Sequence, residues 1–146
     1  MHSGLRVGGR YELTRLIASG GMAEVWEAVD TVLERRVAVK ILHGHLASDD
    51  SFVARFRTEA VAAARLHHPS IVSIFDTCSD DGVEAIVMEL VQGRTLRQAL
   101  DEAGALEPAR VIDIAAEVAD ALQAAHRAGL VHRDIKPANI LLCDDN

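Results

Sequence analysis

The stretch that decides the fold is His132-Arg133-Asp134-Ile135-Lys136-Pro137-Ala138-Asn139, near the C-terminal end of the chain. It follows the apolar dipeptide Leu130-Val131 and places an acid, a base and an amide within eight residues. Such groups can accept a proton, bring positive charge to an anion and offer an oxygen to a divalent metal. Because this spacing is demanding, the motif is a strong indication of an active-site loop.

Length, composition and net charge limit the classes of protein to which the chain can belong. A chain of 146 residues is long enough for one ordinary domain with one core, and 49% hydrophobic with 25% charged residues is typical of a globular protein. The net charge of −7 argues against binding to nucleic acid or to anionic membranes. The sequence contains no apolar run long enough for a membrane span, and Met1–Arg10 lacks the apolar core of a signal peptide.

Cys78 and Cys143 lie far apart and have no metal-like spacing, which indicates two free thiols in a reducing compartment. We therefore expect a cytoplasmic location for this segment. A longer, membrane-anchored parent protein stays open, although no anchor is visible in the chain.

The first half of the chain predicts an antiparallel five-stranded sheet that one helix interrupts. The alternation of apolar residues and the turn residues between them indicate where the strands run. Asp80-Asp81-Gly82 is a hairpin signal between the last two of them. The expected strands are 11–17, 23–29, 36–42, 71–78 and 83–90, after a tail of residues 1–10.

The helix of the first half is expected over residues 51–66, with Ser48, Asp49 or Asp50 as its N-cap. Its inward stripe is expected to consist of residues at steps of four and three: Phe52, Phe56, Glu59, Ala63 and Leu66.

The second half predicts helices. Thr95 can cap a short helix that ends at Gly104, and Pro108 fits the first turn of a longer helix that reaches Ala128, with Gly129 as the C′ residue. The expected buried face of the longer helix is Val111, Ile114, Val118, Leu122 and Ala125. The junction between an N-terminal part, 11–91, and a C-terminal part, 92–146, lies near Val91-Gln92-Gly93.

Glu59 and Lys40 are the two charged residues that this scheme leaves on apolar surfaces. A buried carboxylate and a buried ammonium each need a partner. One ion pair, completed by nucleotide phosphates, would satisfy both, whereas a structural salt bridge or a lysine that reaches out to solvent is the simpler interpretation. Lys40 and Lys136 are also the only lysines among 15 basic residues, which favours a phosphate role for both.

The segment Ile17-Ala18-Ser19-Gly20-Gly21-Met22-Ala23-Glu24-Val25 lies between two expected strands. A glycine-rich turn there can approach phosphates closely and offer backbone N–H groups, although a Gly-Gly turn alone is usually only a hairpin. His43, His45, His67 and His68 form pairs in loops, and we expect them to face solvent rather than to bind a metal.

Together these segments resemble the eukaryotic-like Ser/Thr protein kinases of bacteria, over about Tyr11 to Leu142. Gly20-Gly21-Met22-Ala23 is similar to the bacterial glycine-rich loop, and His67-His68-Pro69-Ser70-Ile71-Val72 to the corner between helix and strand. Lys136, two residues after Asp134, is typical of the Ser/Thr branch. The resemblance implies an α+β protein-kinase-like fold, with a sheet lobe followed by the first helices and the catalytic loop of a helical lobe.

The resemblance also implies roles, with ATP and Mg²⁺ (or Mn²⁺) as cofactors and protein Ser/Thr hydroxyls as substrates. Asp134 would be the catalytic base, Lys136 would touch the γ-phosphate and Asn139 would bind the metal. Lys40 would hold the α- and β-phosphates and pair with Glu59. The nucleotide loop would be Ile17, Ala18, Ser19, Gly20, Gly21, Met22 and Ala23, and the adenine pocket Val25, Ala38, Leu141, the gatekeeper Met88 and the backbones of Glu89 and Val91. His132 and Arg133 would support the loop.

Two departures from the family pattern bear on activity. Ala18 and Ala23 stand where the first and third loop glycines are expected, and Ala18 restricts that end of the loop. The metal-binding Asp-Phe-Gly does not occur in the twelve residues after Asp134. We therefore expect residues 1–146 alone to show negligible phosphoryl transfer.

Three interpretations follow. The first is part of an active Ser/Thr kinase, for which a homodimer of kinase domains is a further expectation. The alternative is a catalytically inactive kinase fragment or pseudokinase that binds nucleotide or a partner. A dinucleotide-binding domain of the Rossmann type is excluded, because the glycines lie between two strands rather than between a strand and a helix.

Overall fold

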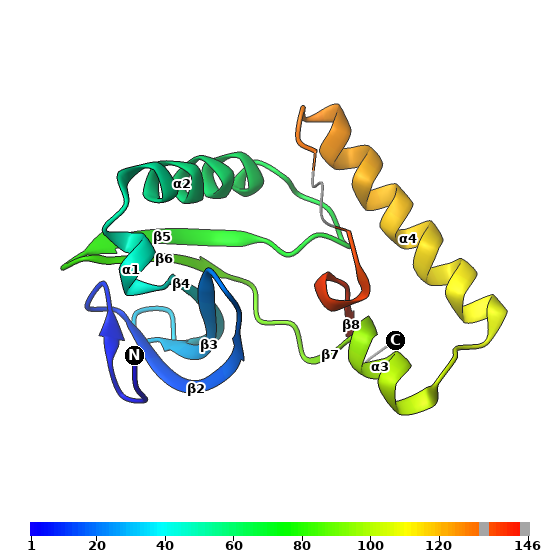
Figure 1. Ribbon diagram of the computed structural model, residues 1–146, viewed down its shortest axis with the longest axis horizontal. Coiled ribbons are helices and arrows are strands. Elements are labelled where there is room, and N and C mark those ends of the chain that lie inside the picture. The colour runs from blue at the N-terminus through cyan, green and yellow to red at the C-terminus, as the bar shows by residue number, and fades with distance from the viewer. Residues whose placement is uncertain (132–134, 144–146) are drawn as a thin grey trace. The chain divides into compact units, whose positions relative to one another are not determined.

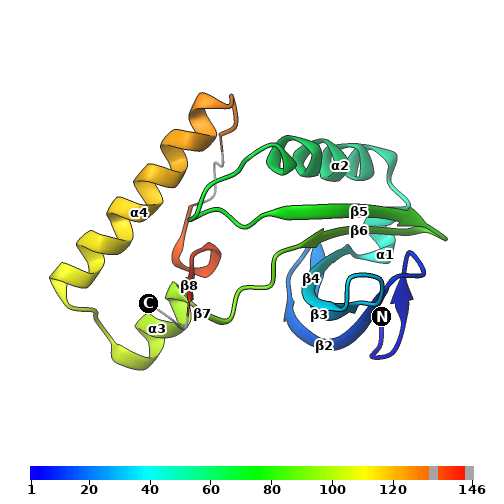
Figure 2. The ribbon, with the colours of Figure 1, turned by 180° about the vertical axis from the view of Figure 1, so that it is seen from behind.

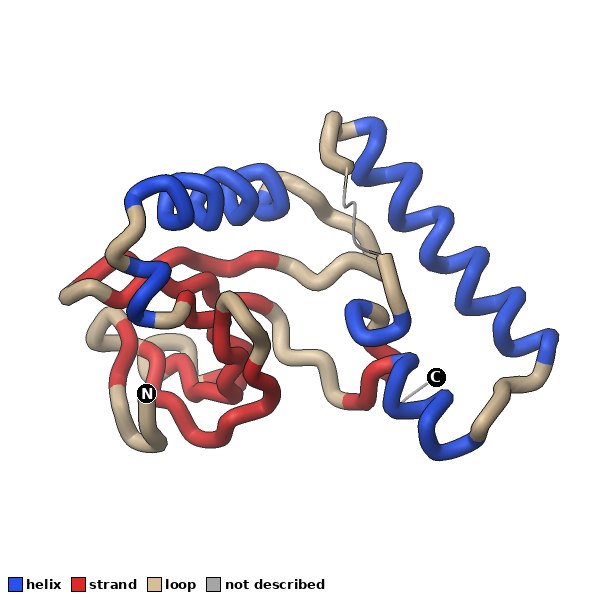
Figure 3. Tube along the Cα trace, viewed as in Figure 1, coloured by secondary structure: helices blue, strands red, loops and turns tan. Residues whose placement is uncertain are grey.

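The computed structural model describes residues 1–131 and 135–143. Contacts divide the chain into two compact units, and each is described here by itself. The first unit consists of Met1–Arg65 and Ser73–Leu90, and the second of Leu66–Val72 and Val91–Asn146. Figure 3 shows that most strands belong to the first unit, whereas the second is mainly helical.

The first unit is built on a six-stranded antiparallel sheet in the order β1-β2-β3-β4-β6-β5. The expectation of five strands was wrong by one, because β1 pairs with the start of β2 through Val7 and Tyr11. Asp81 and Gly82 both have positive φ, as the predicted β5–β6 hairpin requires. The strands are β1 (Arg6–Val7), β2 (Tyr11–Ser19), β3 (Ala23–Asp30), β4 (Arg35–Leu42), β5 (Ile74–Asp80) and β6 (Val83–Met88).

The two faces of this sheet pack against different partners. On one face the curled strands enclose the main core, whose fully buried members include Leu13, Val39 and Val87. On the other face Leu42 and Ile86 pack against Phe56 and Ala60 of the helix. Since residues alternate between faces along a strand, β4 is apolar on both of its faces, except for Arg35 and Arg36 at its start and the exposed Lys40.

The helix that covers the second face is α2 (Asp50–Ala64), which lies along β5 in both views of the ribbon (Figures 1 and 2). A one-turn helix, α1 (Gly44–Ala47), precedes it. The N-cap is Asp49, one of the three predicted residues, and its carboxylate accepts the Ser51 N–H at 3.0 Å. The hydroxyl and backbone N–H of Ser51 hold the pKa of the Asp49 carboxyl below its usual value.

Asp30, at the end of β3, is a fully buried carboxylate that ties the turn after it to the start of β2. Arg10 donates two hydrogen bonds to it, at 2.8 and 2.9 Å, and the N–H groups of Val32 and Leu33 donate two more. These donors, with Arg10 the strongest, hold the pKa of Asp30 far below its ordinary value. The site is therefore structural, because its lone pairs are used inside the fold.

The described residues of the second unit form two α-helices and a short two-stranded sheet. The α3 helix (Leu96–Ala103) begins with a capping box between Thr95 and Gln98, as the sequence predicted for Thr95. The α4 helix (Pro108–Arg127) carries Pro108 in its first turn, also as predicted. The other elements are β7 (Gly93–Thr95), β8 (Leu141–Cys143) and the 3₁₀ turn η1 (Pro137–Asn139).

The segment Leu66–Val72 is fixed to α4 by a histidine. His68 Nε2 lies 2.8 Å from a carboxylate oxygen of Asp120, and the Ser70 N–H donates to His68 Nδ1 at 3.0 Å. Since Nδ1 accepts a hydrogen bond, Nε2 carries the proton in the neutral ring. The expectation that His68 faces solvent was wrong, because its partner lies 52 residues further along the chain.

Within residues 1–131 and 135–143, none of the helices combines the length and the apolar character that a membrane crossing requires.

Candidate nucleotide site

Strand register brings four of the predicted adenine and phosphate residues to one face of the first unit. Val25 lies opposite Lys40 in the β3–β4 pair, and Ala38 lies opposite Met88 in the β4–β6 pair. Directly opposed residues point to the same side of a sheet, and positions 38 and 40 share a side because the period of a strand is two. The face therefore presents the apolar Val25, Ala38 and Met88 beside the exposed ammonium of Lys40.

The glycine-rich segment forms the turn at the open end of β2 and β3. Ala18 lies opposite Val25 and Ser19 opposite Glu24, so both belong to the strand ladder, and the Gly20 N–H donates to Ala23 O at 2.9 Å. The remaining members of the predicted loop lie around this turn, with Ile17 43% and Met22 48% exposed. A Cβ placed on Gly21 meets no heavy atom within 4 Å, so the turn has open space beside it.

A residue that sequence analysis placed in solvent holds this turn. The ring Nε2 of His43 lies 2.7 Å from Gly20 O, and the His43 backbone N–H donates to Met22 O at 2.9 Å. The expectation that His43 faces solvent was therefore wrong. The only sequence signal was its position directly after a strand predicted to neighbour the glycine turn.

Glu59 does not lie on the buried stripe of α2, and this expectation was wrong. The buried residues of the helix are Phe56 and Ala60, and Glu59 is exposed. Among the described residues no ion pair joins Glu59 to Lys40, which is also exposed. In protein kinases this pair must form for activity, and the position of its helix controls it. The roles proposed for Lys40 and Glu59 thus stay predictions.

On the side of α2 opposite to Glu59, an arginine fixes the orientation of the helix. Arg57 donates to both carboxylate oxygens of Glu84 on β6, at 3.1 and 2.6 Å, and also to the Ser79 hydroxyl. Ser79 in turn donates to Glu84 at 2.7 Å. Because Glu84 is buried, this two-pronged contact fixes the helix against the β5–β6 hairpin.

The segment after β6 limits how Glu89 can contact an adenine. The Glu89 N–H already donates to Ser73 O at 2.9 Å, and the Ser73 N–H donates to the Glu89 carboxylate at 3.1 Å. A hydrogen bond from the Glu89 backbone to a ligand therefore has to use its carbonyl oxygen as the acceptor.

The second unit carries the rest of the predicted site. Lys136 precedes the η1 turn, and its carbonyl accepts the Asn139 N–H at 2.9 Å, so the turn sets the spacing of these two side chains. Leu141 begins β8 and is exposed, and Val91 precedes β7. Asp134, with His132 and Arg133, lies outside the described residues.

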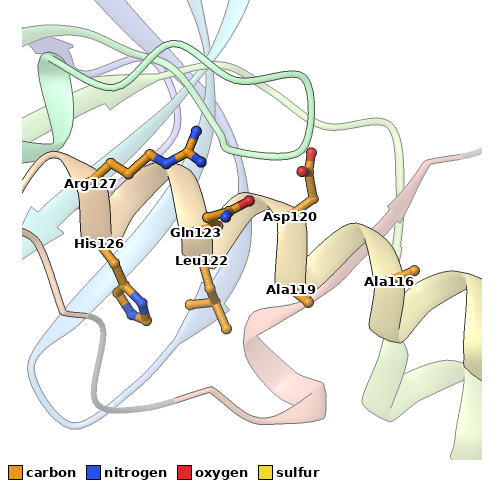
Figure 4. Close-up of a pocket in the computed structure, with 7 residues that line it drawn as sticks. All are labelled: Ala116, Ala119, Asp120, Leu122, Gln123, His126 and Arg127. Atoms are coloured by element: carbon orange, nitrogen blue, oxygen red, sulfur yellow. The ribbon is translucent and has the colours of Figure 1, made fainter.

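Among the described residues of the second unit, α4 lines two pockets, and neither includes a predicted site residue. One, of about 800 Å³, is lined along α4 by Ala116, Ala119, Asp120, Leu122, Gln123, His126 and Arg127 (Figure 4). All of its lining residues come from a single helix, so we assign no ligand to it. The other, of about 420 Å³, is an apolar groove between α3 and α4 whose walls include Val111, Ile114 and Val118.

That groove corrects the expected buried face of α4. Ala121 and Ala125 are the buried residues of the helix, whereas Val111 is 48% exposed and Ile114 and Val118 are half-buried. Within the described part of the chain, nothing covers this stretch completely.

Comparison with known proteins agrees with this geometry. Residues 11–146 match the family described as Protein kinase domain. The probable serine/threonine-protein kinase SCO3848 of Streptomyces coelicolor is 53% identical over 141 residues, which are 94% of this chain and 21% of that protein. Serine/threonine-protein kinase PknA of Mycobacterium tuberculosis is 49% identical over 144 residues, 95% of this chain and 33% of that protein.

The fold is similar to that of a solved kinase domain. The crystal structure of the M. tuberculosis PknI kinase domain matches with a TM-score of 0.85 at 36% identity, over 100% of this chain and 59% of that chain. The chain thus spans between a fifth and a third of the curated relatives named above and somewhat more than half of a solved kinase domain. A family match over nearly the whole chain, together with this fold, shows that the chain belongs to the protein kinase family.

Proposed function

We propose that the chain binds Mg²⁺-ATP and forms part of a Ser/Thr protein kinase that transfers the γ-phosphoryl group to protein hydroxyls. The observation that carries this proposal is the shared face of Val25, Ala38, Met88 and Lys40 on β3, β4 and β6. Apolar side chains beside a single ammonium suit an adenine ring with a phosphate chain. A cytoplasmic location and a homodimer belong to the same proposal.

The phosphate end of the ligand would meet the glycine turn and Lys40. The open space beside Gly21 leaves room for phosphate oxygens to approach the backbone N–H groups. Lys40 offers a compact ammonium, and a charge-assisted hydrogen bond to phosphate is stronger than a neutral one.

In the second unit, the family likeness assigns the γ-phosphate to Lys136, the metal to Asn139 and proton acceptance to Asp134. It also assigns adenine packing to Leu141 and a backbone hydrogen bond with the adenine edge to Val91. The amide oxygen of Asn139 is the type of ligand that Mg²⁺ prefers, and its side chain is exposed on the η1 turn. When bound, Mg²⁺ would neutralise charge on the phosphates.

A fluorescent ATP analogue titrated into the chain with Mg²⁺ tests the proposal. Lys40→Met should raise Kd roughly tenfold or more, because a charged contact is worth about 1.5–3 kcal/mol. Arg110→Met is the matched control, since it removes an exposed cation on α4 outside the proposed site. Equal affinities for the wild type and Lys40→Met would contradict the assignment of Lys40.

A second candidate is a module that binds nucleotide without turning it over. The specific observation in its favour is that Lys40 and Glu59 are both exposed and form no ion pair with each other in the described structure. Measuring binding and phosphoryl transfer on the same sample separates the two. Saturable Mg²⁺-ATP binding without transfer to a Ser/Thr peptide, in this chain and in a complete kinase domain built on it, would favour the module.

A further inference from the structure

His43 makes two contacts with the glycine-rich turn, one from its backbone and one from its ring. The backbone N–H extends the β3–β4 ladder to Met22 O, and Nε2 lies 2.7 Å from Gly20 O. Nδ1 lies 4.0 Å from a carboxylate oxygen of Glu24. Because a carbonyl oxygen can only accept a hydrogen bond, Nε2 has to carry a proton, which fixes the tautomer of the neutral ring.

The Glu24 carboxylate beside His43 is fixed by a residue of the core. Trp26, which is 7% exposed, donates from its indole N–H to the other oxygen of Glu24 at 2.7 Å. The side chains of His43 and Glu24 are themselves only 22% and 25% exposed. The His43 ring, which contacts the backbone of the turn, thus lies beside a carboxylate that the buried indole holds in place.

Holding the Gly20 carbonyl also orients the next N–H group. In a planar trans peptide the C=O and the following N–H point in opposite directions. With Gly20 O directed at His43, the Gly21 N–H points away from His43. The Gly20 N–H to Ala23 O hydrogen bond closes the same turn, and Gly21 has open space around it.

We propose that His43 is a positioning residue for the nucleotide phosphates: its ring fixes the Gly20–Gly21 peptide so that the Gly21 N–H is presented to them. The inference rests on the proposed nucleotide binding but names a residue outside the expected binding loop. His43 does not touch the ligand and acts through the turn.

The test compares the wild type with His43→Ala and His43→Gln, and uses His67→Ala as the control. His67 is an exposed histidine of the second unit, whereas His45 is unsuitable because its ring stacks on His43 at 5.8 Å. Hydrogen exchange of the Gly20 amide is measured without nucleotide, and Kd for a fluorescent ATP analogue is measured with Mg²⁺. Exchange of core amides on β4 and β6 checks that each variant is folded.

His43→Ala should raise Gly20 exchange several-fold and raise Kd roughly three- to tenfold, the loss expected for one neutral hydrogen bond. His43→Gln should recover part of both effects, because its amide can still donate to Gly20 O. His67→Ala should change neither. If His43 had only a structural role, His43→Ala would speed hydrogen exchange of the β4 and β6 amides together with that of the Gly20 amide.

The outcomes separate this inference from the proposed function. If the wild type binds the analogue and His43→Ala changes neither Gly20 exchange nor Kd, the positioning role is refuted while nucleotide binding stands. Faster exchange with an unchanged Kd also refutes it, because the turn is then held for another reason. If the wild type shows no saturable binding, the proposed function and this inference fail together.

Discussion

Replacing Gly93 by Ala should displace β8, the strand that follows the proposed metal ligand. Gly93 lies opposite Cys143 in the β7–β8 pair. A Cβ built on Gly93 would lie 1.8 Å from Leu142 O, 2.9 Å from its carbonyl carbon and 3.2 Å from Cys143 Cα. Ordinary contact begins near 3.4 Å, so the two backbones have to separate by roughly 1.5 Å, which exceeds the range over which their hydrogen bonds persist.

The cost follows from the size of this small sheet. Its register contains three residue pairs, so the separation breaks two or three backbone hydrogen bonds at about 0.5–1.5 kcal/mol each. The local opening free energy should fall by about 1–4 kcal/mol. Hydrogen exchange of residues 93–95 and 141–143 measures this directly, because each 1.4 kcal/mol appears as a tenfold faster exchange when opening limits the rate.

Gly44→Ala provides the matched control, since the same methyl group meets nothing within 4 Å there. It should leave exchange in β7 and β8 unchanged. If Gly93→Ala also leaves it within about twofold of the wild type, the close approach of these strands is not what requires a glycine at position 93, and the reasoning is refuted.

Three other changes test separate parts of the structure. Gly21→Ala should leave the melting curve unchanged, because its methyl group meets open space, but should weaken Mg²⁺-ATP binding in a fluorescence titration; equal affinity would argue against phosphates at this turn. The pKa of Asp30 is depressed in the folded state, so its contribution to stability is complete above the unfolded pKa of about 4 and is lost as pH falls further. Asp30→Asn should therefore flatten the loss of stability in acid denaturation below about pH 4, and an unchanged acid limb would refute this. Glu84→Gln should destabilise α2 by about 1–2 kcal/mol, at the low end for a charged contact because Arg57 is half exposed, and protease cleavage within α2 should quicken accordingly.

Local patterns were sufficient where the partner of a residue lies nearby in sequence. The Asp80-Asp81-Gly82 turn, the Thr95 cap and the Pro108 helix start all depend on their own few residues, and the structure contains all three. The strand β1 was missed because its pairing partner is the start of β2, beyond two glycines with positive φ that are typical of a tail as well as of a turn.

The rotation of α2 could not be predicted from its own residues. The run Ala60-Val61-Ala62-Ala63-Ala64 gives little contrast between faces, so a stripe through Phe56 and Glu59 and one through Phe56 and Ala60 fit almost equally well. The long-range pair of Arg57 with Glu84, 27 residues apart, selects the second. His43 is the same kind of case, because Gly20 lies 23 residues before it.

The orientation that the Arg57–Glu84 pair gives to α2 has a consequence for the proposed site. At about 100° per residue, Arg57 and Glu59 lie roughly 80° to either side of the line through Phe56 and Ala60. Rotation of α2 toward Glu84 therefore moves Glu59 away from the sheet, and rotation the other way costs the Arg57 contact. Since Phe56 and Ala60 carry no charge, the choice between the two ion pairs depends on Arg57 and Glu59. A phosphate chain bound at Lys40 would favour rotation toward the Lys40–Glu59 pair only if Lys40 contacts the phosphates and Glu59 at the same time. Any such rotation has to break the ion pair between Arg57 and Glu84.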